Sequence, residues 1–275
     1  EELNQIIDDE LRREAINSLQ SFNIDQVIYM TNRIVDSILA QNEIMVDLTT
    51  LDTFDHDTYS HSIDVCVLAT TCGVGLGMNT RMLSDLAVAG ALHDIGKQGI
   101  PLTILNKVGE LTDEEKIIIE SHPKIGYDML YNRADISSFV RSGIMSHHEN
   151  WDGGGYPNGL VGEEIPMFGR ILHVVDVYDA LIKKRVYKSG FKHTEAIEFL
   201  MGNCNRMFDI RIVETFLKYV IVYPVGTDVL LSTGEKAHVI KNRSSSVLRP
   251  VVMTKDRRIL DLAKDPKCFN IVILQ

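Results

Sequence analysis

Histidine and aspartate residues occur in this sequence at spacings that suit metal ligands. His93-Asp94 is an adjacent pair at the end of an apolar run, and His147-His148 is a second adjacent pair. Asp57 and His61 are four residues apart, so they would share one face of a helix. An imidazole binds one ion, whereas the two oxygens of a carboxylate can bridge two ions. The sequence therefore predicts a metal centre that contains more than one ion.

The candidate ligands are all imidazoles and carboxylates: Asp57, His61, His93, Asp94, His122, His147, His148 and Asp176. A single histidine of this kind is more often solvated or hydrogen-bonded in a core, but the adjacent pairs argue against that interpretation for the whole set. Ligands without a thiolate favour iron or manganese and, less specifically, magnesium, nickel or zinc. Two or more such ions could hold a bridging hydroxide at neutral pH and bind a phosphoryl oxygen.

Apolar residues at helical spacing predict that helices position these ligands. Helices are expected in residues 1–50, after the acidic stretch 52–57, over 82–92, from Thr112 to Pro123, over 135–148, from Arg170 onward, and over 192–203 and 209–220. Thr112 and Glu115 match a capping box, Pro123 would end that helix, and Gly96 would be the C-cap of the helix before it. The glycine-rich segment 150–159 reads as a shaped binding loop.

The pattern changes after Pro224, where short β-type runs are separated by turn residues. These runs cover residues 229–231, 237–240, 250–253 and 271–274. We expect a mainly α protein with three parts. They are an N-terminal helical segment over 1–54, a helical catalytic domain over 55–222 and a small β-rich subdomain over 223–275.

Composition limits the classes of function. The chain has 275 residues, 45% of them hydrophobic and 24% charged, and no apolar run long enough to span a bilayer. No secretory signal and no C-x-x-C pair is present, so free buried thiols and a cytoplasmic location are expected. A net charge of −10 argues against broad nucleic-acid binding. An anionic substrate would have to be attracted by local cations or bound metal.

Taken together, the motifs closely resemble the HD-GYP family of bacterial phosphodiesterases for the second messenger cyclic di-GMP. The matching segments are His61, His93-Asp94-Ile95-Gly96-Lys97, Ile100-Pro101, His122-Pro123, His147-His148-Glu149, Asp152-Gly153-Gly154-Gly155-Tyr156-Pro157 and Asp176. The resemblance spans roughly residues 55–220. It implies an all-helical HD-domain bundle with a centre of two or three divalent metals. The β-rich tail looks like an extension present in some family members.

The resemblance also implies roles for the ligands. One metal would be bound by His61, His93, Asp94 and Asp176, and Asp94 would bridge to a second metal on His122, His147 and His148. Family members with a third metal carry a carboxylate, commonly Glu, four residues before the first histidine. This chain has Asp57 there. Its side chain is one methylene shorter, so a third site stays open.

Substrate contacts follow from the same resemblance. Lys97 would act with Asp94 in catalysis and bind a phosphate as a point charge, and Arg185 and Lys188 match positions that contact phosphate. Tyr156 would pack on a guanine or shape the mouth of the pocket, or else only stiffen its loop.

Asp179 is expected to support a ligand rather than bind metal. The chain departs from the family at Ile182-Lys183-Lys184, where small or acidic residues are usual. The two lysines could attract an anion, mark another substrate or a partner surface, or simply be solvated.

Three hypotheses on function follow. The leading one is hydrolysis of cyclic di-GMP to pGpG, and then to GMP if a second cut follows, by in-line attack of a metal-bridging hydroxide. The others are a non-catalytic nucleotide- or partner-binding module and an HD hydrolase of another cyclic dinucleotide. The implied partners are the cyclic dinucleotide, diguanylate cyclase domains and a second copy of the chain, with neither nucleic acid nor a membrane bound by this chain.

Overall fold

The computed structural model describes residues 23–41, 44–47, 58–183, 191–243 and 246–274, with Glu10, Arg13, Glu14, Asn17 and Leu19 before them. The α-helices are α2 (Ile24–Leu39), α3 (Thr58–Gly75), α4 (Thr80–Leu92), α5 (Leu102–Leu105), α6 (Asp113–Glu120), α7 (His122–Leu130), α8 (Ser138–Ser146), α9 (Met167–Ile182), α10 (His193–Gly202) and α11 (Ile210–Lys218). Short 3-10 turns are η2 (Ile95–Gly99), η3 (Gly162–Glu164) and η4 (Pro266–Cys268). Within these residues, no helix combines the length and apolar character that crossing a membrane requires.

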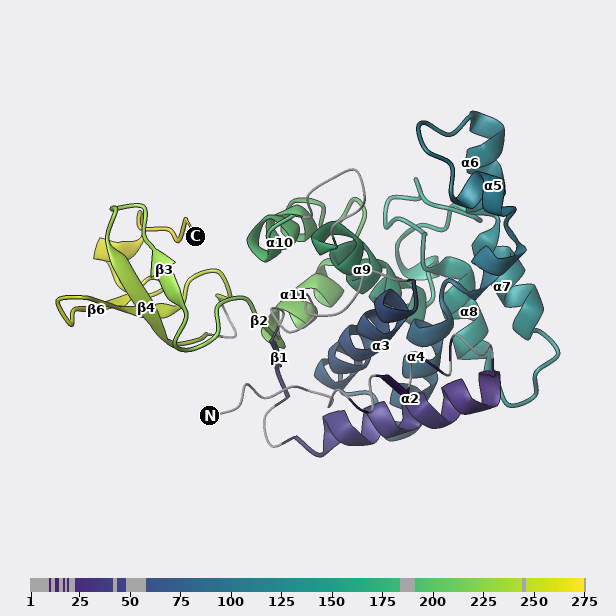
Figure 1. Cartoon of the computed structure of the whole chain (residues 1–275), viewed down its shortest axis with the longest axis horizontal. Helices are drawn as coiled ribbons and strands as arrows, with labels where there is room; N and C mark the ends of the chain where they lie inside the picture. The colour runs from purple at the N-terminus through teal and green to yellow at the C-terminus, as the bar shows by residue number, and fades with distance from the viewer. Residues whose placement is uncertain are drawn as a thin grey trace.

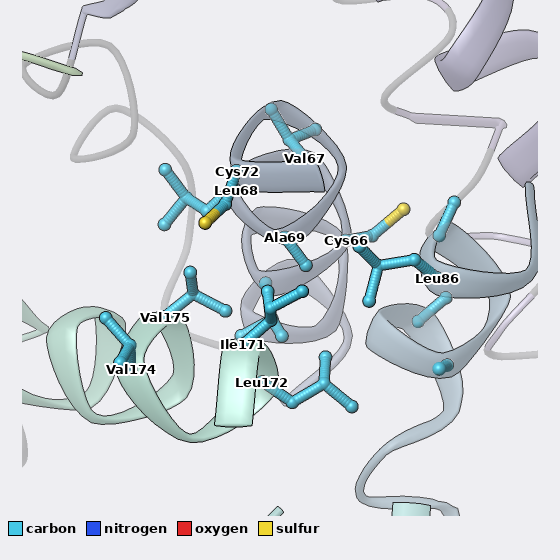
Figure 2. Close-up of a cluster of buried hydrophobic side chains, with 14 of the residues drawn as sticks. Cys66, Val67, Leu68, Ala69, Cys72, Leu86, Ile171, Leu172, Val174 and Val175 are labelled. Carbon is cyan, nitrogen blue, oxygen red and sulfur yellow. The ribbon is translucent and has the colours of Figure 1, made fainter. Parts of the chain in front are cut away.

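Helix α3 is the centre of the helical body (Figure 1). Its residues from Ile63 to Cys72 are almost all buried, because α2, α4, α9 and α11 contact it from different sides. A helix that is apolar on every side is stable only in such a position. Figure 2 shows side chains of α3 packed against Leu86 of α4 and Ile171 of α9. Burial raises the pKa of Cys66 and of Cys72 to about 12, which fits the expected free buried thiols.

A close crossing of α3 and α4 brings the ends of these two helices together. A Cβ at Gly90 would lie 2.8 Å from the Cα of Cys66, so only glycine allows this approach. Helix α4 then ends with His93 as its C-cap, and the prediction that Gly96 caps it is wrong. Gly96 lies within η2 instead, where a Cβ would come 2.0 Å from the carbonyl oxygen of His122. The glycine is needed for contact with α7, not for a left-handed cap.

The segment around Pro123 contains a helix boundary that the sequence reading misplaced. The predicted capping box of Thr112 and Glu115 is confirmed at the start of α6. That helix ends at Glu120, and Pro123 stands in the first turn of α7. A proline fits there because the first helical N–H groups have no partner within the helix. The proline therefore starts a helix that carries His122, rather than ending one.

Helix α2 belongs to the same core as the helices that follow it. Its N-cap Asn23 accepts a hydrogen bond from the backbone N–H of Gln26, and its buried face includes Ile34 and Ile38. Burying each isoleucine contributes about 1.5–3 kcal/mol, so α2 adds substantially to the stability of the helical body. The strands β1 (Val46–Asp47) and β2 (Val220–Ile221) pair in parallel and join the two ends of this body.

The C-terminal residues form a separate small sheet with its own core. Its antiparallel order is β3 (Asp228–Leu230), β4 (Lys236–Lys241), β5 (Val251–Thr254) and β6 (Ile259–Asp261). Residues 271–274, expected as a strand, make only a single bridge between Ile273 and Leu231, while β6 was not predicted. Figure 1 shows this sheet at the end of the molecule opposite α5 and α6. The expected fold class, mainly helical with a small β appendage, is confirmed; the domain limits at 54 and 222 remain predictions.

Candidate metal centre

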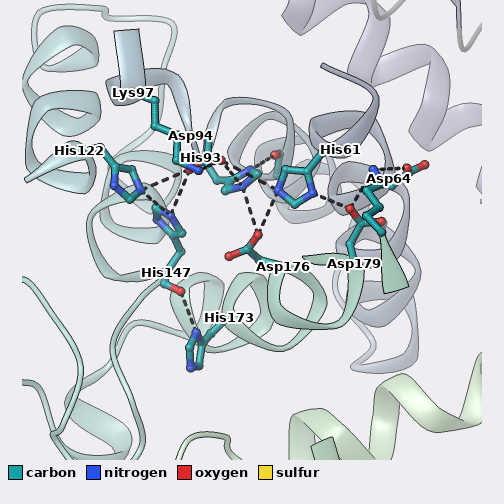
Figure 3. A network of polar contacts seen from close by, with 12 residues as sticks. His61, Asp64, His93, Asp94, Lys97, His122, His147, His173, Asp176 and Asp179 are labelled. Atoms are coloured by element: carbon teal, nitrogen blue, oxygen red, sulfur yellow. Dashed lines mark hydrogen bonds and ion pairs between the residues drawn. The ribbon is translucent and has the colours of Figure 1, made fainter. Parts of the chain in front are cut away.

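Five helices bring histidine and aspartate side chains to one point in the helical body. His61 lies in the first turns of α3, His93 and Asp94 follow α4, His122 begins α7, His147 and His148 follow α8, and Asp176 lies within α9. Figure 3 shows the labelled side chains of this set directed toward one another: His61, His93, Asp94, His122, His147 and Asp176. Their convergence depends on helix packing, because the ligands are supplied by elements far apart in the sequence.

The first group surrounds the carboxylate of Asp176. The Nε2 atom of His61 lies 3.0 Å from Asp176 Oδ1, and Nε2 of His93 lies 3.6 Å from the same oxygen. Asp94 Oδ2 is 3.4 Å from Nε2 of His93. One atom each of His61, His93 and Asp94 lies within 4.8 Å of the others, a spacing that could hold a metal ion.

The second group of candidate ligands lies around Oδ1 of Asp94. Asp94 Oδ1 lies 3.3 Å from Nε2 of His122 and 3.9 Å from Nε2 of His147. Together with His148, these residues form a second set with mutual distances within 4.8 Å. Asp94 is the residue that the two sets share. Each of its oxygens faces one group, the arrangement that a bridging carboxylate needs.

Backbone carbonyls orient three of these imidazole rings. The Nδ1 atoms of His93, His122 and His147 lie 2.8, 2.7 and 2.6 Å from the carbonyl oxygen three residues earlier. A carbonyl only accepts, so each Nδ1 donates its proton, and Nε2 is the nitrogen that faces the centre and is available to a metal. The rings therefore stand in the tautomer that binds metal through Nε2.

His61 is oriented differently, because its Nδ1 lies 2.5 Å from Oδ2 of Asp179. Asp179 is buried on α9 one turn beyond Asp176. The carboxylate accepts from Nδ1 and leaves Nε2 facing Asp176, which matches the expected supporting role of Asp179.

Buried polar atoms at the centre also fit a metal. Nε2 of His93 and Oδ1 of Asp94 are buried and have no hydrogen-bond partner among the described residues. Such atoms cost about 1–3 kcal/mol each when they are left unsatisfied. The nitrogen of His93 faces Asp176 in the first group, and the oxygen of Asp94 faces His122 in the second group. The donor set thus fits divalent cations, which would satisfy both atoms.

The electrostatics divide the centre into two halves. Burial, together with the neighbouring imidazoles, holds the pKa of His147 well below its usual value, and burial lowers that of His148 to about 3. Burial also opposes charge on His61 and His93, but nearby carboxylates outweigh it and raise their pKa to about 9 and about 10. Cations on the His61 side would therefore displace protons, whereas His147 and His148 offer neutral imidazoles.

The predicted substrate residues are only partly described. Lys97 Nζ lies 2.5 Å from Oδ2 of Asp94, and its side chain is about one-third exposed, at 32%. The ring of Tyr156 stacks on His148 with a centroid distance of 4.8 Å. Asp57, Arg185 and Lys188 lie outside the described residues. Tyr156 therefore borders the metal ligands, a position compatible with each role expected for it.

An apolar cavity of about 430 Å³ adjoins the centre on the Lys97 side. Asp94 and Lys97 line it together with Tyr59 of α3, Ala91 of α4 and Leu102 of α5. Its volume is within the range of small-molecule sites. The cavity gives the apolar part of a ligand a place beside the candidate metal ligands.

Several residues that support the site were not identified from the sequence. Glu149 is buried and accepts hydrogen bonds from the backbone N–H groups of Asn158 and Leu160, which holds the glycine-rich loop. His173 lies 3.0 Å from the carbonyl oxygen of His147 through its Nδ1. For His173, its place one turn before Asp176 on α9 was a usable signal. Glu149 was part of the matching segment His147-His148-Glu149, but the sequence assigned it no role.

Comparison with known proteins agrees with this helical body and its buried histidine–aspartate centre. Residues 34–212 match the family described as HD domain, and the chain belongs to that family. A solved HDG"Y"P protein of Bdellovibrio bacteriovorus has a TM-score of 0.61 at 18% identity, over 75% of this chain and 68% of that one. At that identity the likeness concerns the fold.

Sequence relatives narrow the family further. A cyclic di-GMP phosphodiesterase of Pseudomonas aeruginosa is 38% identical over 223 residues, which are 81% of this chain and 54% of that protein. The 3′3′-cGAMP-specific phosphodiesterase 2 of Vibrio cholerae is 32% identical over 213 residues, 76% of this chain and 40% of that protein. The chain thus spans about half the length of these relatives or less. Together with the motifs, they identify it as an HD domain of the HD-GYP type.

Proposed function

We propose that this chain is a metal-dependent phosphodiesterase that hydrolyses cyclic di-GMP. The observation that carries the proposal is the position of Asp94, with one carboxylate oxygen toward each group of imidazoles. Ligands of this type, without thiolate, favour two divalent ions, iron or manganese. Asp57 would complete a third site only if its shorter side chain reaches a third ion.

The proposed reaction is the attack of water on phosphorus, with the 3′-oxygen of the diester as leaving group. When bound, divalent ions supply an activated water and stabilise charge on the phosphoryl oxygens. His61, His93, Asp94 and Asp176 would hold one ion; Asp94 would reach the other, which His122, His147 and His148 would hold. The products would be pGpG and, after a second cut, GMP.

The remaining residues would place the substrate. Lys97 would turn from Asp94 toward a phosphate, and Arg185 and Lys188 would also contact phosphate. Tyr156 and the apolar cavity near Lys97 would receive the bases, since both border the candidate ligands. We also propose diguanylate cyclase domains and a second copy of the chain as partners, with the reaction in the cytoplasm.

The experiment uses protein purified without oxygen and loaded with Mn²⁺ or Fe²⁺. It is incubated separately with cyclic di-GMP, 3′3′-cGAMP and cyclic di-AMP, and the products are separated by chromatography. We expect cyclic di-GMP to be consumed most rapidly and pGpG to appear first. The Asp94→Asn variant is the control and should leave all three substrates intact.

Two other outcomes point elsewhere. Preferential cleavage of 3′3′-cGAMP would support the second candidate function, which the 32% identical Vibrio cholerae relative favours. If the metal-loaded protein binds a dinucleotide but leaves all three intact, the chain is a binding module and the proposed function is wrong.

A further inference from the structure

Lys183 belongs to a buried ion cluster directly behind the candidate ligand His61. Its Nζ atom lies 2.8 Å from Oδ2 of Asp64 and 2.9 Å from Oδ2 of Asp179. The side chains of both aspartates are 0% exposed, and that of Lys183 is 15% exposed. Lys183 is therefore not the solvated lysine that one sequence interpretation allowed, and its charge is directed at protein carboxylates.

Burial by itself would lower the pKa of Lys183, but the carboxylates of Asp179 and Asp64 outweigh burial and raise it. The lysine is therefore a cation at neutral pH. Two carboxylates buried without a cation would be strongly destabilising. Among the residues that the structure describes, Lys183 lies within ion-pair distance of both carboxylates.

The crossing of α3 and α9 places the three residues of this ion cluster next to one another. Asp64 is three residues after His61 on α3, while Asp179 and Lys183 follow Asp176 along one face of α9. The same crossing thus forms the His61–Asp176 contact and, one turn further, the ion cluster. Figure 3 shows His61 between Asp176 on one side and Asp179 on the other.

The orientation of the His61 ring depends on a side chain, whereas the orientation of the other three rings depends on the backbone. His93, His122 and His147 donate Nδ1 to carbonyls of the backbone, which are fixed by helix geometry. His61 donates to the side chain of Asp179, which can rotate unless something holds it. The same Oδ2 atom of Asp179 meets both His61 Nδ1 and Lys183 Nζ.

We propose that Lys183 is a positioning residue for the metal on the His61 side of the centre. It holds the Asp179 carboxylate on His61 Nδ1, so that Nε2 faces the centre, and it thereby strengthens binding of that ion. The inference rests on the proposed function only in requiring that the centre binds metal. It assigns no role to Lys183 at the His122–His147–His148 side.

The test measures metal affinity instead of activity. The 275-residue chain, freed of metal with a chelator, is titrated with Mn²⁺, and free Mn²⁺ is followed by electron paramagnetic resonance. In Lys183→Met, which keeps the length of the side chain and removes its charge, we expect one of the two binding events to weaken roughly tenfold to a hundredfold. The second event should be unchanged. Lys183→Arg should restore most of the lost affinity, because a guanidinium can pair with two carboxylates.

Two variants separate positioning from simple stability. Arg170→Met removes a cation from the same helix, where the guanidinium of Arg170 lies 3.0 Å from the buried Asp209 and also donates to the carbonyl oxygen of Ile165, so its partners are not candidate ligands. It should lower the melting temperature and leave both Mn²⁺ events intact. Should Lys183→Met fold poorly, Asp64→Asn combined with Lys183→Met removes one carboxylate with the cation, and it should still show the weakened event.

The inference is overturned if Lys183→Met, or the double variant, binds both ions like the wild-type chain and only melts earlier, as Arg170→Met does. In that case the proposed function stands, because the wild-type chain has bound two ions. A wild-type chain that binds no Mn²⁺ would instead remove the proposed metal centre, and the role of Lys183 with it.

Discussion

Asp94 shows how a single residue connects the two halves of the candidate centre. Its Oδ2 faces His93 and its Oδ1 faces His122, and the side chain is only 5% exposed. The adjacent position of His93 and Asp94 in the sequence allows this, because His93 caps α4 while Asp94 already begins the turn toward α7. The loss of Asp94 should therefore affect both groups of ligands.

We predict that Asp94→Ala binds neither metal stably, whereas His122→Ala first loses only one. Each variant is loaded with Mn²⁺ and desalted, and its metal content is measured by elemental analysis. We expect close to no retained metal for Asp94→Ala and about half the wild-type content for His122→Ala, since two ions share one bridging carboxylate. Equal losses in both variants would contradict a bridging role.

At the scale of elements, the short helix α5 forms one wall of the apolar cavity beside the centre. Leu102 lines this cavity although its side chain is 69% exposed, so a larger residue fits there without disturbing the core. Val108 is 70% exposed on the following segment and does not line the cavity. The two positions form a matched pair.

We predict that Leu102→Trp raises KM for the dinucleotide roughly tenfold, with metal content and melting temperature unchanged, because the indole narrows the space proposed for a base. Steady-state kinetics with cyclic di-GMP measures the effect. Val108→Trp should leave KM at the wild-type value. An equal KM for both variants and the wild type would exclude the cavity as part of the substrate site.

Helix α11 is joined to α9 by a buried ion pair. Asp209 caps α11 by accepting from the N–H of Arg211, and it also pairs with the side chains of Arg211 and Arg170. Burial alone would raise the pKa of Asp209, but these hydrogen bonds outweigh burial and lower it. A carboxylate whose pKa is lowered in the folded state stabilises the fold at pH values above its unfolded-state pKa. This contribution is lost as the pH falls through the folded-state pKa.

We predict that Asp209→Asn lowers the free energy of unfolding by about 1–3 kcal/mol at pH 7. The difference in unfolding free energy between Asp209→Asn and the wild-type chain should shrink as the pH falls below about 4, the usual pKa of an aspartate in an unfolded chain. Urea unfolding at a series of pH values measures this difference. Asp113→Asn, at a carboxylate that is 92% exposed, is the control and should change little. A difference independent of pH would contradict the ion-pair explanation.

At the scale of the whole molecule, the net charge of −10 opposes an anionic substrate. Attraction has to act over short distances, from Lys97 and from bound ions. Long-range repulsion is screened by salt, with a Debye length of about 10 Å at 0.1 M. The overall field therefore should not steer the dinucleotide toward the site.

We predict that kcat/KM stays constant or rises, by up to about threefold, when KCl is increased from about 0.05 to about 0.3 M. Rates at low substrate concentration measure it directly. A steep fall with salt would mean that a local basic surface dominates the approach of the substrate.

Local features of this protein could be predicted from its residue types and their spacing. Ligand types and their spacing predicted the histidine–aspartate centre, and capping rules predicted the start of α6 at Thr112. The capping prediction is confirmed because a cap depends only on contacts within a few residues, whereas the convergence of the ligands depends on helix packing. Pro123 and Gly96 were misread because their roles depend on α7, a neighbouring helix that local pattern did not reveal.

Helix packing sets which oxygen of Asp94 faces which group, and it pairs the half-buried Lys183 with the buried Asp64. Lys183 and Asp64 are 119 residues apart in the sequence, and no local pattern relates them. Their contact results from the crossing of α3 and α9, which is set by the packing of apolar faces around the core. The sequence determined which groups could do the chemistry, whereas packing determined which of them meet and which charges support them.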